Sequence, residues 1–148
     1  MSTGGKTSIG ILSALGNKVA ITLGGELTDS NPDAVSVNPE DATVNILASE
    51  LIIDGDQLVT SIETTVTTLD LTTAATSITE TDGVALADST VTGQLDLVTG
   101  GATSIGALTA TSQTVNLSLG GALTDGDADA SGVDTTVNVT AETLNLLG

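Results

Sequence analysis

Short runs of alternating apolar and polar residues recur along this chain and predict β-strands. In each run, Val, Ile, Leu or Ala alternates with residues that are mostly Thr, Ser, Asn or Asp. A period of two with many β-branched residues is typical of strands that bury one face. The runs recur at intervals of roughly 20 to 26 residues, within the range of stacked repeat proteins. They are Val19–Leu23, Val44–Ile46, Val66–Leu71, Leu95–Leu97, Val115–Leu119 and Val137–Val139.

A longer repeat contains these runs. The stretch Thr3–Asp29 returns without a gap, 96 residues later, as Thr99–Asp125. Turn-forming pairs such as Gly24-Gly25 separate the runs, and no segment combines a helical stripe with helix start and stop signals. We therefore predict a single repeat array over residues 1–148, with copy one at 3–98 and a partial copy two at 99–148.

Two all-β folds fit this pattern. In a parallel β-solenoid of about six coils, each coil contacts only its neighbours, so unequal coils and partial repeats are tolerated. Tandem immunoglobulin-like β-sandwich repeats are the alternative, because 96 residues is close to the size of one such domain. The chain has no aromatic residue and therefore lacks the core Trp of such domains. The solenoid is the favoured hypothesis.

The solenoid hypothesis also predicts which side chains stack. Equivalent residues of successive coils would lie about 4.8 Å apart, so six coils would be on the order of 30 Å tall. Each buried aliphatic side chain would contribute about 1.5–3 kcal/mol to stability. One expected inward column is Val19, Val44, Leu69, Leu95, Val115 and Val137, and the next is Ile21, Ile46, Leu71, Leu97, Leu117 and Val139.

Composition excludes several classes of function. The chain has two lysines, no arginine or histidine and nineteen acidic residues, which gives a net charge of −17. Nucleic-acid backbones require clusters of cations, so we expect no nucleic-acid partner. No apolar run is long enough to span a bilayer, so we expect no membrane insertion. Cysteine is absent, which removes disulfides and thiolate chemistry.

Phrases rich in Thr, Gly, Asp and Val fill the chain, among them Ser61–Leu69, Ile78–Gly83 and Val91–Leu95. They resemble the repeat regions of giant bacterial surface proteins, the filamentous-haemagglutinin-like, two-partner-secreted adhesins with right-handed parallel β-helix stalks. The resemblance covers nearly the whole chain. It implies a secreted stalk or filament segment, extracellular or at the cell surface. The opening Met1–Lys6 has no signal-peptide character, so we expect the targeting signal to lie outside this stretch.

Two acidic turns are candidate calcium sites, because hard cations bind several oxygen ligands around a tight turn. Oxygen-bearing residues alternate in the same way in both copies of the repeat. An EF-hand requires Gly at its sixth position, where this chain has Ala34 and Ala130, so a solvated acidic turn is the alternative. Calcium is the one cofactor that the sequence suggests. The six candidate metal ligands are Asp29, Asn31, Asp33, Asp125, Asp127 and Asp129.

Two further motifs suggest other chemistries. Gly5-Lys6-Thr7 resembles the end of a phosphate-binding loop, but the second copy reads Gly101-Ala102-Thr103, so the lysine is not part of the repeat unit. Thr-x-Thr triplets resemble the threonine ladders of ice-binding solenoids, although Thr is also a common strand residue. The triplets are Thr65–Thr67, Thr90–Thr92 and Thr109–Thr111.

No catalytic set is apparent in the sequence. Without His, Cys, Arg or aromatic residues, only pairs of Asp and Glu could act, as they do in glycosidases, and we expect no enzymatic activity. The leading hypothesis is a structural or adhesive repeat segment that self-associates head-to-tail by stacking its coils. A calcium-binding or ice-binding solenoid module is the alternative, and no receptor is predicted.

Overall fold

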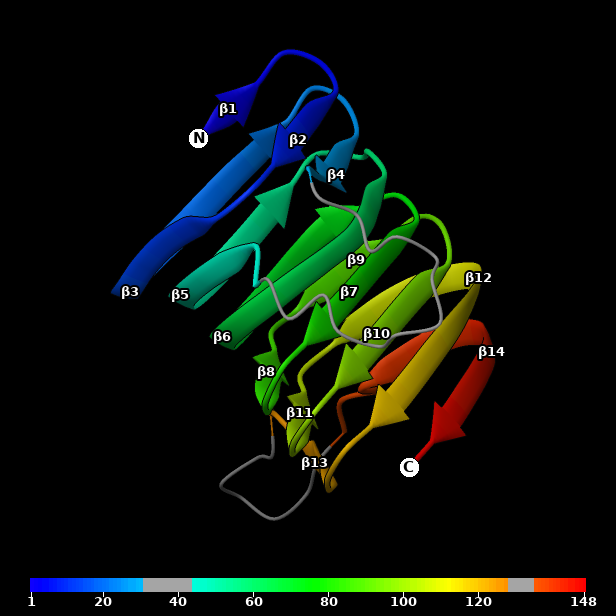
Figure 1. The fold of residues 1–148 in the computed structure, drawn as a ribbon. Coiled ribbons are helices and arrows are strands. Elements are labelled where there is room, and N and C mark those ends of the chain that lie inside the picture. The colour runs from blue at the N-terminus through cyan, green and yellow to red at the C-terminus, as the bar shows by residue number, and fades with distance from the viewer. Residues whose placement is uncertain (31–43, 128–134) are drawn as a thin grey trace, which may run out of the picture.

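The computed structural model describes residues 1–30, 44–127 and 135–148. Every regular element in these ranges is a β-strand, so the described part holds no helix that could cross a membrane (Figure 1). All strand pairings in these ranges are parallel. Immunoglobulin-like sandwiches pair their strands antiparallel, so the sandwich alternative is wrong.

Strand lengths range from two to fifteen residues. The strands are β1 (Ser2–Thr3), β2 (Thr7–Ile9), β3 (Leu12–Leu23), β4 (Leu27–Asp29), β5 (Ile46–Asp54), β6 (Val59–Thr73), β7 (Thr76–Glu80), β8 (Val84–Leu86), β9 (Ser89–Val91), β10 (Leu95–Thr99), β11 (Thr103–Ile105), β12 (Leu108–Leu119), β13 (Leu123–Asp125) and β14 (Val139–Leu147).

Each strand pairs with a later part of the chain in the same direction, so the chain repeatedly returns to its starting side. Ile62 pairs with Ile78, 16 residues later, and Leu95 pairs with Val115, 20 residues later. The longest path of neighbours runs β1-β3-β5-β6-β7-β10-β12-β14. Figure 1 shows these strands side by side along the molecule. One row of paired residues contains Thr7, Leu27, Val59, Thr76, Leu95, Val115 and Leu144.

The core is a set of aliphatic rows that cross the strands. In β10 the buried residues alternate with Asp96 and Val98, which face outward, as the period of two requires. Stacked aliphatic side chains therefore supply most of the apolar burial in a chain without aromatic residues. One buried row consists of Leu51, Leu69, Leu86 and Ile105, each at most 2% exposed.

The predicted inward columns are only partly confirmed. Leu95–Leu97 pairs with Val115–Leu117 as expected, but Leu69 pairs with Leu86 rather than with Leu95. The expected spacing was too long, because three-residue strands such as β8 and β11 are too short to show alternation. Other expected neighbours that do not pair are Val19 with Val44, Ile21 with Ile46, and Val115 with Val137.

The two copies of the sequence repeat occupy different rows. Thr7 belongs to the row that contains Leu95, whereas its counterpart Thr103 pairs with Val84 and Leu123. Local features are nevertheless kept. Gly16 and its counterpart Ser112 both have positive φ, 71° and 60°, at matching register shifts in β3 and β12. The sequence repeat therefore specifies local strands and bends rather than position in the stack.

Glycines at the corners allow neighbouring passes of the chain to approach closely. A Cβ atom added at Gly120 would lie 2.5 Å from the carbonyl oxygen of Gly100, which is far inside van der Waals contact. The Gly120 N–H donates to the Thr99 carbonyl at 2.7 Å, so the backbone there cannot move away without losing that bond. Any larger residue at Gly120 would separate the two corners.

Candidate functional site

Three of the six predicted metal ligands, Asp29, Asp125 and Asp127, lie in the described part of the chain. In that part, no group of three or more His, Cys, Asp and Glu side chains is placed to hold a metal ion. The carboxylates instead accept hydrogen bonds from asparagine amides. The other three candidate ligands, Asn31, Asp33 and Asp129, lie outside the described residues.

The amide of Asn138 lies among several oxygen atoms. Its Nδ2 donates to Oδ1 of Asp125 at 2.9 Å, to Oδ1 of Asp127 at 2.8 Å and to the carbonyl oxygen of Ile105 at 3.1 Å. A nitrogen donor neutralises these acceptors as a cation would, and their spacing is set by hydrogen bonds rather than by metal coordination. In this arrangement the asparagine closes the turn and links β11 and β13 to the start of β14.

Copy one contains the same contact in a more constrained form. Asn45 is 1% exposed, and its Nδ2 donates to Oδ1 of Asp29 at 2.8 Å. The Glu63 N–H donates to Oδ1 of Asn45 at 2.9 Å, which fixes the orientation of the amide, because a flipped amide would face one donor with another. Asn45 therefore has a structural role in joining strand ends.

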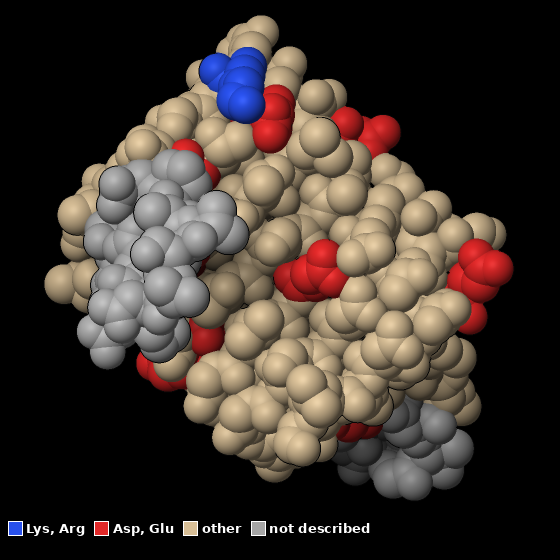
Figure 2. Space-filling model, turned by 45° about the vertical axis from the view of Figure 1, so that its right-hand side comes forward, with Lys and Arg blue, Asp and Glu red and all other residues tan. Residues whose placement is uncertain are grey.

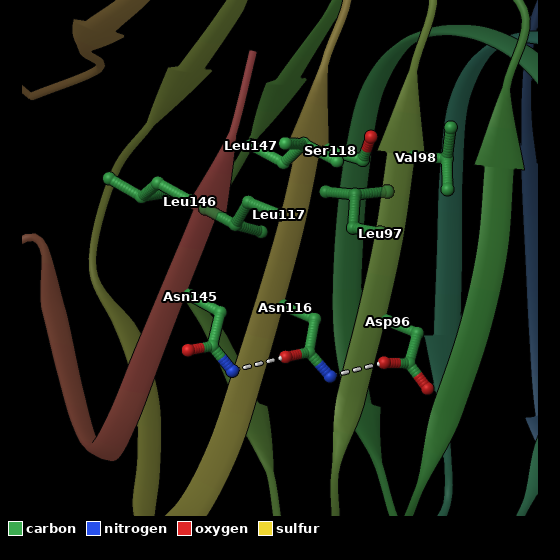
Figure 3. A pocket seen from close by; sticks show the side chains of 9 residues that line it. All are labelled: Asp96, Leu97, Val98, Asn116, Leu117, Ser118, Asn145, Leu146 and Leu147. Atoms are coloured by element: carbon green, nitrogen blue, oxygen red, sulfur yellow. Dashed lines mark hydrogen bonds between the residues drawn. The ribbon is translucent and has the colours of Figure 1, made fainter.

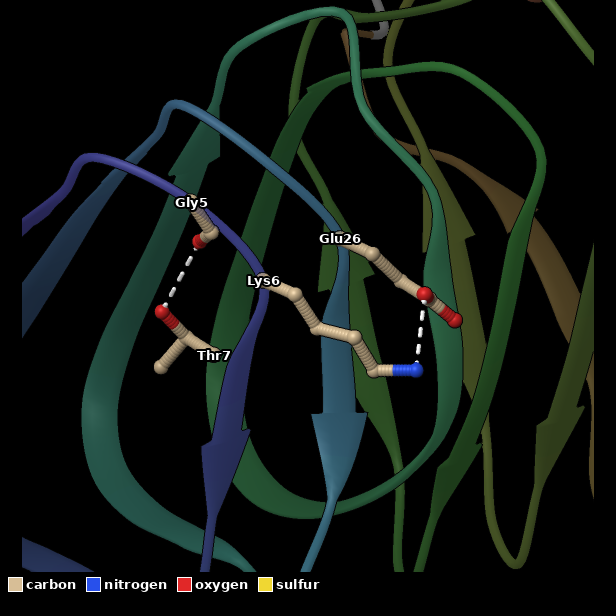
Figure 4. Close-up of polar contacts among 4 residues, drawn as sticks. All are labelled: Gly5, Lys6, Thr7 and Glu26. Atoms are coloured by element: carbon tan, nitrogen blue, oxygen red, sulfur yellow. Dashed lines mark hydrogen bonds and ion pairs between the residues drawn. The ribbon is translucent and has the colours of Figure 1, made fainter.

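The Gly5-Lys6-Thr7 motif is built differently from a phosphate site (Figure 4). Lys6 Nζ lies 3.0 Å from Oε2 of Glu26, and the Thr7 hydroxyl donates to the Gly5 carbonyl at 3.2 Å. The other lysine, Lys18, lies 3.0 Å from Oε1 of Glu50. Both cations thus pair with a carboxylate on a neighbouring strand. Exposed pairs of this kind contribute about 0–1 kcal/mol each.

The negative charge is unevenly distributed along the chain. Both lysines and only two of the nineteen acidic residues fall within residues 1–30, so the whole net charge of −17 comes from the remainder. Figure 2 shows lysine at one place on the visible face, beside an acidic side chain, with other acidic side chains spread over that face. The first passes of the chain are therefore close to neutral, and the later ones are acidic.

A shallow groove of about 290 Å³ lies on the outer face of β10, β12 and β14 (Figure 3). Along one side, the Asn145 amide donates to Oδ1 of Asn116 at 2.7 Å, and the Asn116 amide donates to Oδ1 of Asp96 at 2.6 Å. Figure 3 shows Val98 and Leu147 away from this polar ladder, with Leu97 between the two rows. The ladder's amide groups bond to one another and tie neighbouring strands together.

Sequence reasoning did not identify this polar ladder, although a signal was present. A polar residue stands between two aliphatic residues in Leu95–Leu97, Val115–Leu117 and Leu144–Leu146. The first two runs are predicted strands, whereas the third was not recognised as equivalent. Its distance along the chain differs because residues 128–134 intervene.

Glu80 is a buried acid that sequence reasoning also missed. Its side chain is 1% exposed, and its Oε2 accepts hydrogen bonds from the Thr64 hydroxyl at 2.7 Å and from the Val66 N–H at 3.0 Å. Burial raises the pKa of this carboxyl to about 7, and the hydrogen bond from Thr64 opposes the rise only in part. No catalytic partner set surrounds it in the described residues. Its consequence is for stability.

Comparisons with known proteins identify no relative of this chain. No protein-family model, curated protein or solved structure matches it. The resemblance to filamentous-haemagglutinin-like adhesins thus stays a prediction from the sequence. Any function must be argued from the parallel rows, the exposed surfaces and the charge.

Proposed function

We propose that this chain is a structural, non-enzymatic segment of an exported bacterial surface protein or extracellular filament, folded as a right-handed parallel β-solenoid. The observation that carries this proposal is the parallel pairing of each pass with the next, through buried aliphatic rows. A solenoid gains stability from contacts between neighbouring coils and provides a stiff, extended scaffold. One row has seven levels, from Thr7 to Leu144, which supports about six to seven coils.

An adhesive or filament role at the cell surface is consistent with the surface chemistry. Acidic residues cover the later passes, and this charge keeps a long repetitive protein soluble. The described grooves are shallow and lack a convergent set of reactive side chains. The groove beside Asn116 is bounded by amides and aliphatic side chains, groups that suit packing better than catalysis.

Both ends of the stack support head-to-tail self-association. β1 pairs only with β3, and β14 pairs only with β12, so each end has an open strand edge in the described structure. At the β14 end, Leu144 and Leu146 are 43% and 55% exposed, although their row partners Val115 and Leu117 are buried. A second copy stacked there would cover these side chains and extend the rows. The near-neutral first passes would meet the acidic end without added repulsion.

We expect the purified chain to form head-to-tail oligomers or fibres at high concentration and moderate salt, because salt screens the repulsion between acidic molecules. Leu146→Lys would place a charge at the open end and should shift the protein towards monomers in light scattering. Leu58→Lys is the matched control, since Leu58 is 47% exposed away from the ends. Strictly monomeric wild-type particles across concentration and salt would contradict assembly by coil stacking, as would equal effects of the two substitutions.

A second candidate function is calcium binding at the Asn138 turn. The supporting observation is that two carboxylate oxygens and one carbonyl oxygen lie within 3.1 Å of the same nitrogen. Rotation of the Asn138 amide would add its own oxygen to this set, and hard cations require such all-oxygen surroundings.

Calorimetric titration with Ca²⁺ tests the second candidate. A calcium site predicts a saturable, stoichiometric heat that is lost when Asp125→Asn and Asp127→Asn are combined. The control Asp96→Asn removes a carboxylate from the groove on the outer face of β10, β12 and β14 and should leave that heat unchanged. Heats that never saturate, or that fall equally in both variants, would rule out the site and leave only diffuse attraction of cations to an acidic surface.

A further inference from the structure

Four exposed threonines form a row across successive strands. Thr72 pairs with Thr90 and Thr109 with Thr140, and Thr90 and Thr109 are themselves paired. All four side chains are exposed, and the intervening residues, such as Val91, are buried. Register partners on neighbouring strands lie about 4.8 Å apart. We call these residues, Thr72, Thr90, Thr109 and Thr140, the threonine row.

The hydroxyl groups of the threonine row are available for binding. No hydrogen bond engages any of the four within residues 1–30, 44–127 and 135–148. Other threonines of the chain are used internally: the Thr65 hydroxyl bonds to that of Thr81 at 2.5 Å. The sequence triplet at Thr65–Thr67 therefore does not belong to this surface, whereas the triplets that begin at Thr90 and Thr109 do.

A second line of exposed threonines runs beside the row. Thr92 and Thr111 stand two residues beyond Thr90 and Thr109 on the same strands, and both are exposed. Residues i and i+2 of a strand lie about 6.6–6.8 Å apart. Hydroxyl and methyl groups thus repeat in two directions on a rigid sheet, at distances on the scale of the spacing of water molecules in an ice surface.

The chemistry of this surface favours ordered water over other partners. The row itself carries no charge from Thr72 to Thr140, although the chain as a whole is strongly acidic. Aromatic rings, on which planar ligands stack, are absent from the entire chain. Methyl groups favour a partner that already orders water around them, and the hydroxyls can replace water molecules in its surface.

We propose that the threonine row, extended by Thr92 and Thr111, is an ice-binding surface. The parallel sheet holds the array in place before binding, so little conformational entropy is lost when ice is bound. Each hydroxyl hydrogen-bonds to the outer water layer, and each methyl group fills a gap between water molecules. This activity is independent of coil stacking between molecules, because the row lies along the side of the stack and not at its ends.

The test is inhibition of ice recrystallisation, together with thermal hysteresis, by the purified 148-residue protein. We expect the wild type to be active and the double variant Thr90→Tyr, Thr109→Tyr to lose activity, since two rings would obstruct both lines of threonines. The matched control is Thr60→Tyr, Thr79→Tyr, which alters exposed strand threonines on another row and should retain activity. Circular dichroism would verify that each protein is folded.

A gentler variant keeps the test decisive if the tyrosines disturb folding. Thr90→Ser with Thr109→Ser keeps the hydroxyls and removes only the methyl groups, so activity should fall while the fold is kept. The proposal is overturned if the wild type is no more active than an unrelated acidic protein at equal concentration. It is also overturned if row and control variants behave alike. Loss of fibres in light scattering, with ice activity unchanged, would contradict stacking alone.

Discussion

Replacing Leu97 by Asp should prevent the chain from folding. Leu97 is 1% exposed and lies in a row between Ile78 and Leu117. A carboxylate there would have no cation near it, because both lysines pair with acids on other strands. Burying an unpaired charge costs several kcal/mol or more, which is comparable with the total stability of about 5–15 kcal/mol of an ordinary domain.

Val98→Asp is the matched control for this prediction. Val98 follows Leu97 in β10 but is 45% exposed, so the new charge would stay in water and change stability by only about 0.5 kcal/mol. Urea denaturation followed by circular dichroism would compare the two variants. Similar damage at both positions would mean that the inward and outward faces of β10 are wrongly assigned, and with them the aliphatic rows.

The long alternating runs could be read from the sequence because their period directly reflects burial. Leu95–Leu97 and Val115–Leu117 are strands, are buried as predicted, and pair with each other. Their burial follows from a local rule, since side chains in a strand alternate between two faces. The all-β class could therefore be predicted without knowledge of any distant contact.

The order of the rows could not be predicted, because it depends on how much chain separates two partners. Thr72, Thr90 and Thr109 are 18 and 19 residues apart, whereas Thr109 and Thr140 are 31 apart. The longer interval contains residues that contribute no rung to this row. A fixed period therefore assigns wrong neighbours, as it did for Leu69. The threonine row was for this reason visible in the sequence only as two unconnected triplets.

The candidate site residues illustrate the same limit. The acidic turns at Asp29 and Asp125 stand out in the sequence as possible metal ligands. Their observed partners, Asn45 and Asn138, are 16 and 13 residues away along the chain. Composition identifies the acceptors but does not identify which donor the fold brings to them. Glu80 was missed because an acid at the end of a strand is usually solvated, and its burial depends on Thr64 in the neighbouring pass.

Glu80 leads to the last prediction, that this protein is more stable at mildly acidic pH than at alkaline pH. Burial raises the pKa of the folded-state carboxyl from its ordinary value of 4.5 to about 7. The folded state therefore binds this proton more tightly than the unfolded state does. The resulting stability is fully present below pH 4.5 and is lost as the pH rises through about 7. Its size is about 3 kcal/mol, from the two pKa values and the linkage relation.

Glu80→Gln isolates this contribution. Glutamine cannot ionise, and its carbonyl oxygen can still accept the bonds that Thr64 and Val66 donate to Glu80. Repulsion among the other carboxylates also weakens on acidification, but it does so in both proteins. We therefore expect urea denaturation between pH 4.5 and 8 to show a steeper loss of stability in the wild type than in the variant.

Asp82→Asn is the control for the Glu80 experiment. Asp82 lies two residues away in the same turn and is exposed, and its backbone N–H donates to Glu80 Oε1 at 3.4 Å. The asparagine variant keeps that N–H while removing one charge, so it should follow the wild-type pH dependence. If Glu80→Gln and the wild type instead give parallel curves, the Glu80 carboxylate must reach water in solution. The inward orientation of the end of β7 would then be wrong, because an ionised acid held among aliphatic rows without a cation must favour its protonated form.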